Sequence, residues 1–471
     1  MAGLKSKRAA DNSNNGYSET LEYKVLHQNN VSKNSNKFYV LELQKNPKGH
    51  FRVFTHYGRL GITNVYEIRD ESEGSPIKDM EVAKKEFDTI YREKLRGKTA
   101  IDKETGEKVK ESYVLVDVVS PSVGSENIRG KAEKTIAVNL SKAIDTSTYD
   151  PAVSKLVDQL IEENVHNITS MTSLKFTSNG FETPVGSVTP DHVKKSRDPL
   201  NELNKLLDKD GKAAITKDVR ELNNLYYSLI PHPFGRKITE ADLILDSVKL
   251  QQEFDLLDQL ETAVQMGAAM AGSAKSKMDA LGTDIDILEN KSEWERIKDY
   301  IESSKASNHR GSDVWRYKPA KIFKIKIPNE RKRYETGGKK KGNVEEVFHG
   351  SASSNCLSIM HGGLIIPPTN APHVCGRLNG NGAYGANSST KSLNYSIGYW
   401  GGRKSKNSNA FLFLADFAMG KTYSTQESCP RGAPSGYDSV WAKAGKSLYN
   451  DELIVYDLAQ CTLKYIVELK G

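Results

Sequence analysis

Hydrophobic and polar residues partly alternate through the first quarter of the chain, in short runs separated by turn residues. The runs at 23–26, 37–43 and 51–55 are rich in aromatic and aliphatic residues, as expected for strands with one buried face. The sequence at 46–49, Asn-Pro-Lys-Gly, is typical of a tight turn between two of them. From 83 to 94 the spacing of apolar residues becomes helical. This region is therefore predicted to form a small antiparallel sheet with one helix.

Helical periodicity dominates the middle of the chain. Pro151 opens a segment in which apolar residues recur at spacings of three and four, the pattern of one helix face. Proline is favoured at the first position of a helix. A long periodic run follows from 241 to 270. We expect an all-helical bundle over residues 146–275.

Beyond residue 276 the helical and strand patterns are mixed. Residues 294–301 follow a helical pattern, whereas 321–327 alternate between lysine and apolar residues as in a half-buried strand. Further strands are expected where apolar residues precede His349 and follow Glu452. Residues 276–471 are therefore predicted to form a mixed α/β domain. The chain as a whole is predicted to be an α+β protein of several domains.

The length of 471 residues agrees with this division, since it suggests about two to four domains. We assign residues 19–120 to the N-terminal sheet domain and 121–145 to a linker. Residues 1–18 are rich in Lys, Asn and Ser and have almost no apolar side chains. We predict a disordered tail there.

Composition narrows the class of protein. Hydrophobic residues make up 37% and charged residues 27%, and no apolar run reaches the length of a membrane span or of a signal-peptide core. We expect a protein that acts inside a cell without a membrane partner. The net charge of +7 permits nucleic-acid binding without arguing for it. The four cysteines include no Cys-x-x-Cys pair, so neither a metal site nor a disulfide framework is predicted.

Three runs in the last third of the chain place polar groups at strand ends or glycine turns, where catalytic residues often lie. The first is His349-Gly350-Ser351, directly after an apolar strand. The second combines Gly-Asn-Gly-Ala-Tyr at 380–384 with Lys-Ser-Leu-Asn-Tyr at 391–395. In the third, Glu452 precedes the strand that ends in Ile-Val-Tyr-Asp. The glycines of the second run also match a dinucleotide-binding spacing, but no strand–helix unit surrounds them, so we discount that fold.

Taken together, these three runs resemble the catalytic domain of the poly(ADP-ribose) polymerases. The sequence Tyr-Ser-Leu-Ile-Pro-His at 227–232 resembles the regulatory domain of the DNA-dependent members. Residues 20–120 resemble a WGR domain, with Tyr57 in place of the usual Trp before Gly58 and Arg59. The resemblance implies three domains: a WGR sheet with one helix, an all-helical regulatory bundle, and an ADP-ribosyltransferase domain with two packed sheets.

The resemblance also implies roles for residues that match the catalytic motif. His349, Tyr384 and Glu452 correspond to the catalytic set of polymer-forming members, with Glu452 binding the nicotinamide ribose and stabilising positive charge. NAD-binding roles follow for His349, Gly350, Ser351, Tyr384, Ser392 and Tyr395. Among these, His349 would bond the adenosine ribose, Gly350 and Ser392 the carboxamide, and the two tyrosines would flank the nicotinamide ring. No cofactor beyond the substrate NAD is expected.

For the WGR region, the resemblance implies that Tyr57, Gly58 and Arg59 sense DNA ends or strand breaks. A tyrosine can stack on a terminal base, but Tyr57 can equally pack the turn in which it lies. Acceptor proteins, including this protein itself, are the other expected partners. The family implies a nuclear location in a eukaryotic cell and a cytoplasmic one otherwise.

Two departures from the family pattern keep alternatives open. Ile365 stands where DNA-dependent members usually have an Arg that contacts the adenosine end, and Asp451 lies beside Glu452 as a second candidate carboxylate. Our interpretation is a poly(ADP-ribose) polymerase activated by DNA breaks. A mono-ADP-ribosyltransferase on the same fold, or a catalytically weak DNA-binding module, are the alternatives.

Overall fold

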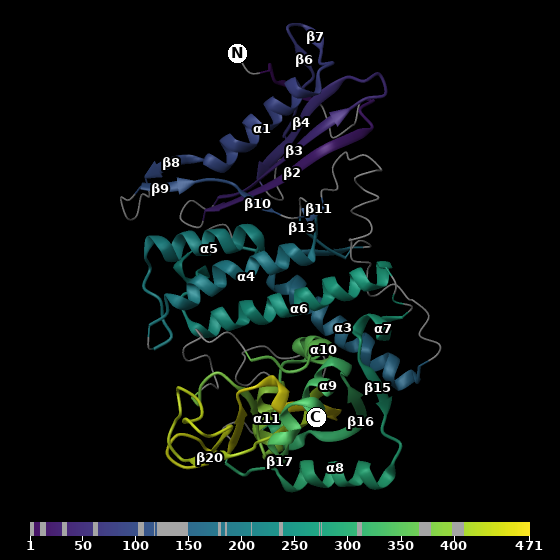
Figure 1. The fold of residues 1–471 in the computed structure, drawn as a ribbon, viewed down its shortest axis with the longest axis vertical. Coiled ribbons are helices and arrows are strands. Elements are labelled where there is room, and N and C mark those ends of the chain that lie inside the picture. Colours follow the sequence, from purple (N-terminus) through teal and green to yellow (C-terminus); the bar gives the residue numbers. More distant parts are fainter. Residues whose placement is uncertain are drawn as a thin grey trace.

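A computed structural model describes most of the 471 residues. The residues outside it are 1–3, 10–15, 31–34, 60–64, 102–107, 117, 120–148, 178–179, 184–185, 209, 235–238, 273, 275, 309–312, 367–377 and 398–408. The predicted linker at 121–145 therefore lies outside the described residues. The described parts form three domains stacked along the long axis of the molecule, in chain order from one end to the other (Figure 1).

The N-terminal domain is a six-stranded antiparallel sheet with helix α1 (Met80–Arg96) across one face. In spatial order the strands are β1 (Lys7–Ala9), β5 (Val65–Arg69), β4 (Phe51–Arg59), β3 (Ser35–Lys45), β2 (Glu19–Asn30) and β10 (Val114–Val116). Two short hairpins complete the domain: β6 (Glu71–Ser72) with β7 (Ser75–Pro76), and β8 (Lys98–Ile101) with β9 (Lys108–Glu111). Phe87 and Ile90 of α1 pack on Leu26 and Leu41 of the sheet, as the helical spacing predicted.

Part of the segment predicted as a disordered tail is ordered. Lys7–Ala9 forms strand β1, which pairs antiparallel with β5 at the edge of the sheet. Lys7 also lies 2.6 Å from a carboxylate oxygen of Glu71. An exposed sheet edge offers unpaired backbone groups, and this polar segment satisfies them without burying apolar side chains. Composition alone therefore predicted disorder where backbone pairing imposes a strand.

The central domain consists of helices around a long apolar helix, with one small sheet. The helices are α3 (Pro151–Met171), α4 (Pro190–Lys205), α5 (Lys217–Leu229), the short 3-10 helix η1 (Glu240–Asp242), α6 (Ser247–Gly272) and α7 (Lys277–Leu281). The sheet has the order β11 (Val118–Val119), β14 (Gly186–Val188), β13 (Gly180–Thr183) and β12 (Lys175–Thr177). The expected all-helical bundle is therefore interrupted by strands between α3 and α4. Phe176 and Phe181 pack against each other there with ring centroids 4.8 Å apart.

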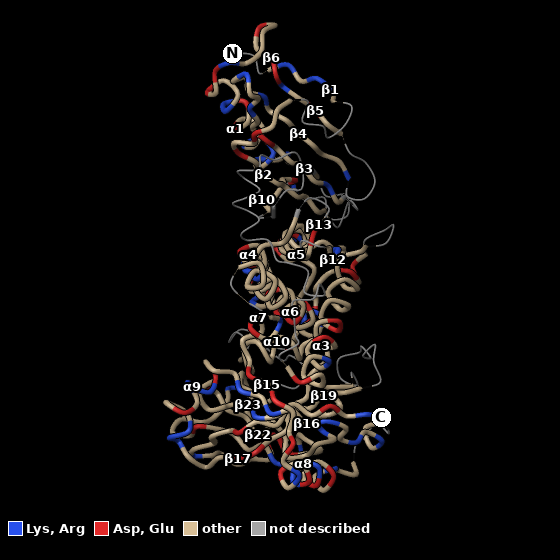
Figure 2. Tube along the Cα trace, turned by 90° about the vertical axis from the view of Figure 1, so that its right-hand side faces the viewer, with Lys and Arg blue, Asp and Glu red and all other residues tan. Residues whose placement is uncertain are grey.

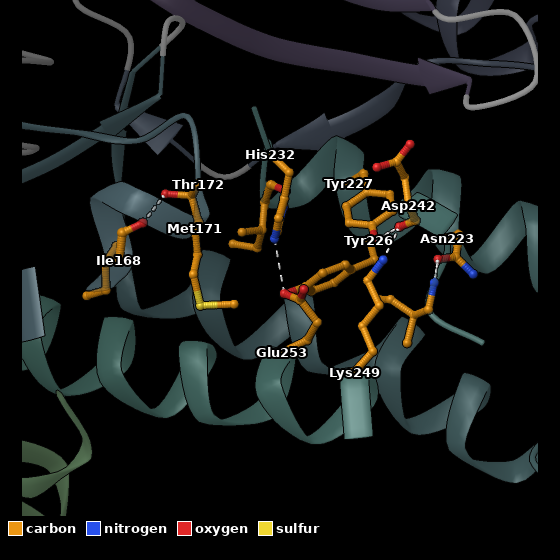
Figure 3. A network of polar contacts seen from close by, with 12 residues as sticks. Ile168, Met171, Thr172, Asn223, Tyr226, Tyr227, His232, Asp242, Lys249 and Glu253 are labelled. Carbon is orange, nitrogen blue, oxygen red and sulfur yellow. Dashed lines mark hydrogen bonds and ion pairs between the residues drawn. The ribbon is translucent and has the colours of Figure 1, made fainter. Parts of the chain in front are cut away.

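A polar cluster is buried inside the central domain, at the carboxylate of Glu253 on α6 (Figure 3). Glu253 is only 3% exposed. The hydroxyl of Tyr226 donates to its Oε2 at 2.7 Å, and Nε2 of His232 lies 3.1 Å from the same oxygen. Nearby, Lys249 donates to the main-chain oxygen of Asp242 at 2.6 Å. A buried carboxylate needs such partners, because burial without them is costly.

This cluster makes the stability of the central domain depend on pH. Burial opposes the charge on both partners, but their mutual attraction outweighs it, so the pKa of His232 is raised and the pKa of Glu253 is lowered. The charged pair then stabilises the fold fully below about pH 6.5, the ordinary histidine value, and this stabilisation is lost as the pH rises through the raised pKa. The lowered pKa of Glu253 acts at the acid end of the pH range. Its contribution to stability is complete above the ordinary glutamate pKa and is lost only as the pH falls through the lowered value.

We therefore expect the melting temperature of the protein to fall as the pH rises from about 6 to about 8, and part of that fall to vanish in His232→Gln. Thermal unfolding followed by circular dichroism over this range measures the effect. His166→Gln is the matched control, because His166 is exposed on α3. If the melting temperatures of the wild type and His232→Gln changed equally with pH, the prediction would be contradicted.

The C-terminal domain has two sheets that pack together. The first has the order β15 (Asp284–Ile287), β16 (Lys318–Lys326), β23 (Cys461–Lys470), β19 (Asn409–Ala418) and β17 (Val344–Gly350). The second has the order β18 (Ala383–Gly385), β22 (Glu452–Val455), β21 (Ser439–Ala442) and β20 (Thr422–Thr425). A bridge between Phe348 and Ala386 joins the two. The helical segments are α8 (Lys291–Ser303), η2 (Asp313–Arg316), α9 (Pro328–Thr336), η3 (Gly338–Lys341), α10 (Ser353–Gly362), α11 (Ser389–Ser396) and η4 (Leu458–Gln460).

The N-terminal and central domains meet at the carboxyl end of α5. The last four carbonyl groups of a helix have no partner inside it, and here side chains supply the donors. Ring nitrogens of His27, His192 and His232 lie 2.7–2.8 Å from the main-chain oxygens of Ser228, Leu229 and Ile230, in that order. A carbonyl oxygen only accepts, so each of these ring nitrogens carries the proton. Burial lowers the pKa of His27 to about 4, although its bond to Ser228 works in the other direction.

Charged residues are spread over all three domains, with Lys and Arg interspersed among Asp and Glu (Figure 2). In the full sequence the formal net charge is +3 over residues 1–120, −4 over 121–275 and +8 over 276–471, so the positive excess lies mainly in the C-terminal domain. In the part of the chain that the structure describes, no helix is both long and apolar enough to cross a membrane.

Candidate active site

Most of the predicted site residues surround one cavity of about 200 Å³ in the C-terminal domain. The cavity lies where the end of β17, strand β18, helix α11 and the start of β22 come together. Its walls include six residues that the sequence singled out: His349, Gly350, Tyr384, Ser392, Tyr395 and Glu452. The seventh, Ser351, lines an adjoining cavity of about 290 Å³ together with His349. Ile365 lines both cavities and is 53% exposed.

His349 is held in one protonation form by its neighbours. Its Nδ1 lies 2.9 Å from the main-chain oxygen of Tyr384. Because a carbonyl oxygen can only accept, Nδ1 carries the proton and the Nε2 of the neutral ring is an acceptor. Burial lowers the pKa of His349, while the bond to Tyr384 works against that shift. The ring is therefore neutral near pH 7 and can accept a bond from a sugar hydroxyl.

Gly350 and Ser392 bring two backbone segments into close contact. A Cβ atom at position 350 would overlap the main-chain oxygen of Ser392, so only glycine fits there. The Ser392 hydroxyl donates to the main-chain oxygen of Phe348 at 2.9 Å. Its lone pairs remain able to accept an N–H. Together with the backbone of Gly350, this arrangement suits recognition of a planar amide.

Tyr384 is fixed at both ends. Its backbone lies in β18, opposite Ile454 of β22. Its hydroxyl donates to the main-chain oxygen of Gly380 at 2.7 Å and accepts from the N–H of Asn379 at 3.1 Å. Tyr395 reaches the same cavity from α11. Two rings on the walls of one small cavity can flank a flat aromatic ligand.

Glu452 is the carboxylate of the cavity, and Asp451 is not. Glu452 is 5% exposed, and its Oε1 lies 2.8 Å from the ammonium of Lys391. Asp451 is instead bound by the indole N–H of Trp441 at 2.7 Å and the N–H of Ala444 at 2.8 Å. Burial opposes its charge, but these donors keep the pKa of Asp451 lowered. Asp451 therefore stabilises the loop between β21 and β22 through these hydrogen bonds. Its position beside Glu452 in the sequence was the reason to consider it as the catalytic carboxylate, and the structure gives it this other role.

Sequence reasoning missed two residues that contact Glu452. Lys391 belongs to the quoted run at 391–395 but received no role, although it precedes Ser392 on the same helix. Burial lowers the pKa of Lys391, against the attraction of Glu452. Asn379 also reaches Glu452, with its Nδ2 3.4 Å from Oε2. A lysine in the second motif was a usable signal, whereas nothing in the local sequence marks Asn379.

The adjoining cavity lies between two domains, because helix α6 of the central domain forms one wall. Asp255, Asp258 and Glu261 of α6 line it opposite Ser351. Arg197 of α4 holds two of these carboxylates, at 2.6 Å from Asp258 and 2.5 Å from Glu261. Access to this cavity therefore depends on the position of a helix from another domain.

The three residues predicted to bind DNA lie together at the end of β4 in the N-terminal domain, where Gly58 pairs with Phe38 and Phe38 pairs with His27 of the junction with α5. Tyr57 stacks on Tyr39 with ring centroids 5.0 Å apart, and its hydroxyl donates to Glu67 at 2.9 Å. Arg59 is exposed at the end of the strand. In this structure Tyr57 packs on its own sheet, so binding a base with this ring would require it to exchange partners.

Among the residues that the structure describes, no group of His, Cys, Asp and Glu side chains is arranged to hold a metal ion. The described residues that line the cavity supply a neutral imidazole from His349, hydroxyls, backbone amides and the Glu452 carboxylate beside the Lys391 ammonium. These groups can bind a ligand with an amide and sugar hydroxyls, and they can stabilise a positive charge.

Three family models match the chain in succession. Residues 23–107 match the WGR domain, 147–290 match the regulatory domain of poly(ADP-ribose) polymerase, and 291–471 match its catalytic domain. Together the matches extend over all three domains of the structure.

Whole proteins are also similar to this chain over nearly its entire length. Protein mono-ADP-ribosyltransferase PARP3 of Homo sapiens is 23% identical, over 94% of this chain and 87% of its own length. Poly(ADP-ribose) polymerase 2 of Arabidopsis thaliana is 24% identical, over 95% of this chain and 72% of its own. The poly(ADP-ribose) polymerase of Sarcophaga peregrina is 27% identical over 94% of this chain, which spans 45% of that longer protein.

Proposed function

The chain belongs to the poly(ADP-ribose) polymerase family and is an NAD-dependent ADP-ribosyltransferase, and we propose that its reaction takes place in the cavity at Glu452. The observation that carries this proposal is the convergence of His349, Tyr384 and Glu452 on one cavity. These residues come from β17, β18 and β22, which are far apart in the sequence. NAD is the substrate, and the family chemistry requires no further cofactor.

In the proposed mechanism, the cavity binds the nicotinamide half of NAD. Gly350 and Ser392 bond the carboxamide, and Tyr384 and Tyr395 flank the ring. Nicotinamide leaves with the electron pair of its bond to C1′ of the ribose, so positive charge builds on that sugar. The carboxylate of Glu452 stabilises this charge. An acceptor oxygen then forms the new bond to C1′ and loses its proton to Glu452 or to solvent.

The adjoining cavity accounts for the other half of the substrate. His349 lines both cavities, and its neutral ring offers an acceptor to a hydroxyl of the adenosine ribose. Ser351 lies on the same wall. Ile365 provides no charge at this end, so the pyrophosphate and adenosine gain less electrostatic attraction than an Arg would supply.

We propose that the product is a polymer attached to proteins, including this protein itself. Glu452 is placed to orient the hydroxyl of an already attached ADP-ribose as the next acceptor. Transfer of a single unit is the second candidate, favoured by the loss of an Arg at Ile365. The similar human protein is named a mono-ADP-ribosyltransferase. The length of the product distinguishes the two candidates.

We also propose that DNA ends or strand breaks activate the enzyme through the central domain. Helix α6 forms a wall of the adenosine-side cavity, and the carboxyl end of α5 is bonded by His27 and Asn29 of the N-terminal sheet. A DNA end held at Tyr57, Gly58 and Arg59 would act on α6 through this junction. In a eukaryotic cell such a partner implies a nuclear location, and otherwise a cytoplasmic one.

Incubation with labelled NAD, with and without blunt or nicked DNA, tests these proposals together. We expect a long ladder of modified protein that requires DNA, and less stimulation by DNA in His27→Ala, because loss of the bond to Ser228 weakens the junction through which DNA would act. His50→Ala is the matched control, because His50 lies between β3 and β4 of the same domain, away from the junction. A single product band would establish mono-transfer, and equal labelling without DNA would refute the activation proposal. No labelling at all would refute transfer.

A further inference from the structure

Asn379 connects the two halves of the candidate site, although no motif includes it. It is 1% exposed and lies directly before Gly380. All four of its hydrogen-bonding groups are engaged. Its main-chain N–H donates to the hydroxyl of Tyr384 at 3.1 Å, and its main-chain oxygen accepts from the hydroxyl of Tyr456 at 2.6 Å. Its side chain bonds Cys429 and Glu452.

The partners of the side chain determine which way its amide points. The main-chain N–H of Cys429 donates to Oδ1 at 3.0 Å, and a donor of this kind requires an oxygen. The carboxylate of Glu452 accepts only, and therefore requires the NH₂ group, which lies 3.4 Å from Oε2. Both neighbours demand the same orientation, so the NH₂ group faces Glu452.

The two oxygens of Glu452 thus have different partners. Lys391 binds Oε1 at 2.8 Å, and Asn379 reaches Oε2 at 3.4 Å, the long end of the hydrogen-bond range. The last torsion of a glutamate side chain is soft. A carboxylate bound at one oxygen can therefore turn about this bond, whereas one bound at both oxygens has a fixed plane.

We propose that Asn379 is a positioning residue that fixes the carboxylate plane of Glu452 and couples it to the hydroxyl of Tyr384. This inference rests on the proposed function, since it assumes that Glu452 acts on the substrate. The main chain of Asn379 holds the Tyr384 hydroxyl, while its side chain holds Glu452. A shift of this one residue would displace both groups together.

Asn379→Asp tests the proposal with a minimal change. Aspartate has the same size, keeps an acceptor for Cys429 and keeps both main-chain bonds. Only the donation to Glu452 is lost, and a second carboxylate takes its place. Two carboxylates at this distance oppose each other's ionisation. We expect kcat to fall about tenfold to a hundredfold near pH 7, with KM for NAD nearly unchanged.

The pH profile distinguishes this role from a merely structural one. Because activity requires ionised Glu452, the acid limb of kcat should move to higher pH in Asn379→Asp, with recovery in alkaline buffer. Asn379→Ser removes the amide without adding charge. It should lower kcat without moving the limb. Asn290→Asp is the matched control, since it adds one charge to the same domain at a helix N-cap, where Asp and Asn serve equally.

Release of nicotinamide by the DNA-activated full chain is the measurement, with thermal unfolding and nicotinamide binding as checks on the fold. An unchanged kcat in Asn379→Ser would overturn the proposal, even if Asn379→Asp did not fold. A folded Asn379→Asp with the wild-type pH profile would also overturn it. If the wild type released no nicotinamide, the proposed function would fail, and this inference with it.

Discussion

Replacing Glu452 with glutamine is expected to lower NAD turnover about a hundredfold or more, because the site loses the carboxylate that we propose stabilises the charge on the ribose. Glutamine has nearly the same shape, so the cavity and the binding of nicotinamide should persist. The loss should therefore appear in kcat rather than in KM. Release of nicotinamide from NAD, with DNA present, measures the effect.

Asp451→Asn is the comparison that identifies the reacting carboxylate. Asp451 accepts from Trp441 and Ala444 and is not among the residues that line the cavity. We expect this variant to lose some stability and to keep turnover within a few-fold of the wild type. A larger loss of turnover in Asp451→Asn than in Glu452→Gln would reverse the assignment.

Gly350→Ala is expected to abolish nicotinamide binding and to destabilise the C-terminal domain. The added methyl group would overlap the main-chain oxygen of Ser392, so α11 would have to move away from β17. Overpacking of this kind typically costs about 1–3 kcal/mol. Movement of α11 would displace Ser392 and Tyr395 from the cavity together. Thermal unfolding and nicotinamide titration measure the two consequences.

Gly272→Ala is the matched control, because a methyl group at the end of α6 would meet no atom within contact distance. We expect equal or slightly higher stability there, since alanine favours a helix more than glycine does. Nicotinamide binding to Gly350→Ala with wild-type affinity would show that the backbone adapts, and would refute the steric argument.

The sequence predicted those helices and strands in which the buried apolar residues recur at a regular spacing along the chain. The helix at 83–94 appeared as α1 because Phe87 and Ile90 lie on one face, and Pro151 does begin α3, with Asp150 as its cap. The small sheet of the central domain was missed, because strands such as Lys175–Thr177 are too short to show a period. Strand β1 was missed because its backbone pairing with β5 holds it as a strand, whereas its composition is that of a disordered segment.

The same distinction applies to the site. His349, Tyr384, Ser392 and Glu452 stand in recognisable runs, and the structure brings them to one cavity. Asn379 could not be found this way, because its partners Cys429 and Tyr456 lie far along the chain and come near only through folding. The role of Asp451 likewise became evident only from its bonds to Trp441 and Ala444.

The carboxyl end of α5 has a consequence for how the molecule unfolds. Donors from the N-terminal sheet bond the carbonyls of Tyr227 and Ser228, and histidines of the central domain bond the next two. The end of this helix thus belongs to two domains at once. Opening the junction exposes buried polar groups on both sides, so β2 and the last turn of α5 should exchange their amide hydrogens as one cooperative unit. The boundary of cooperativity then falls inside the central domain and does not coincide with the boundary between domains.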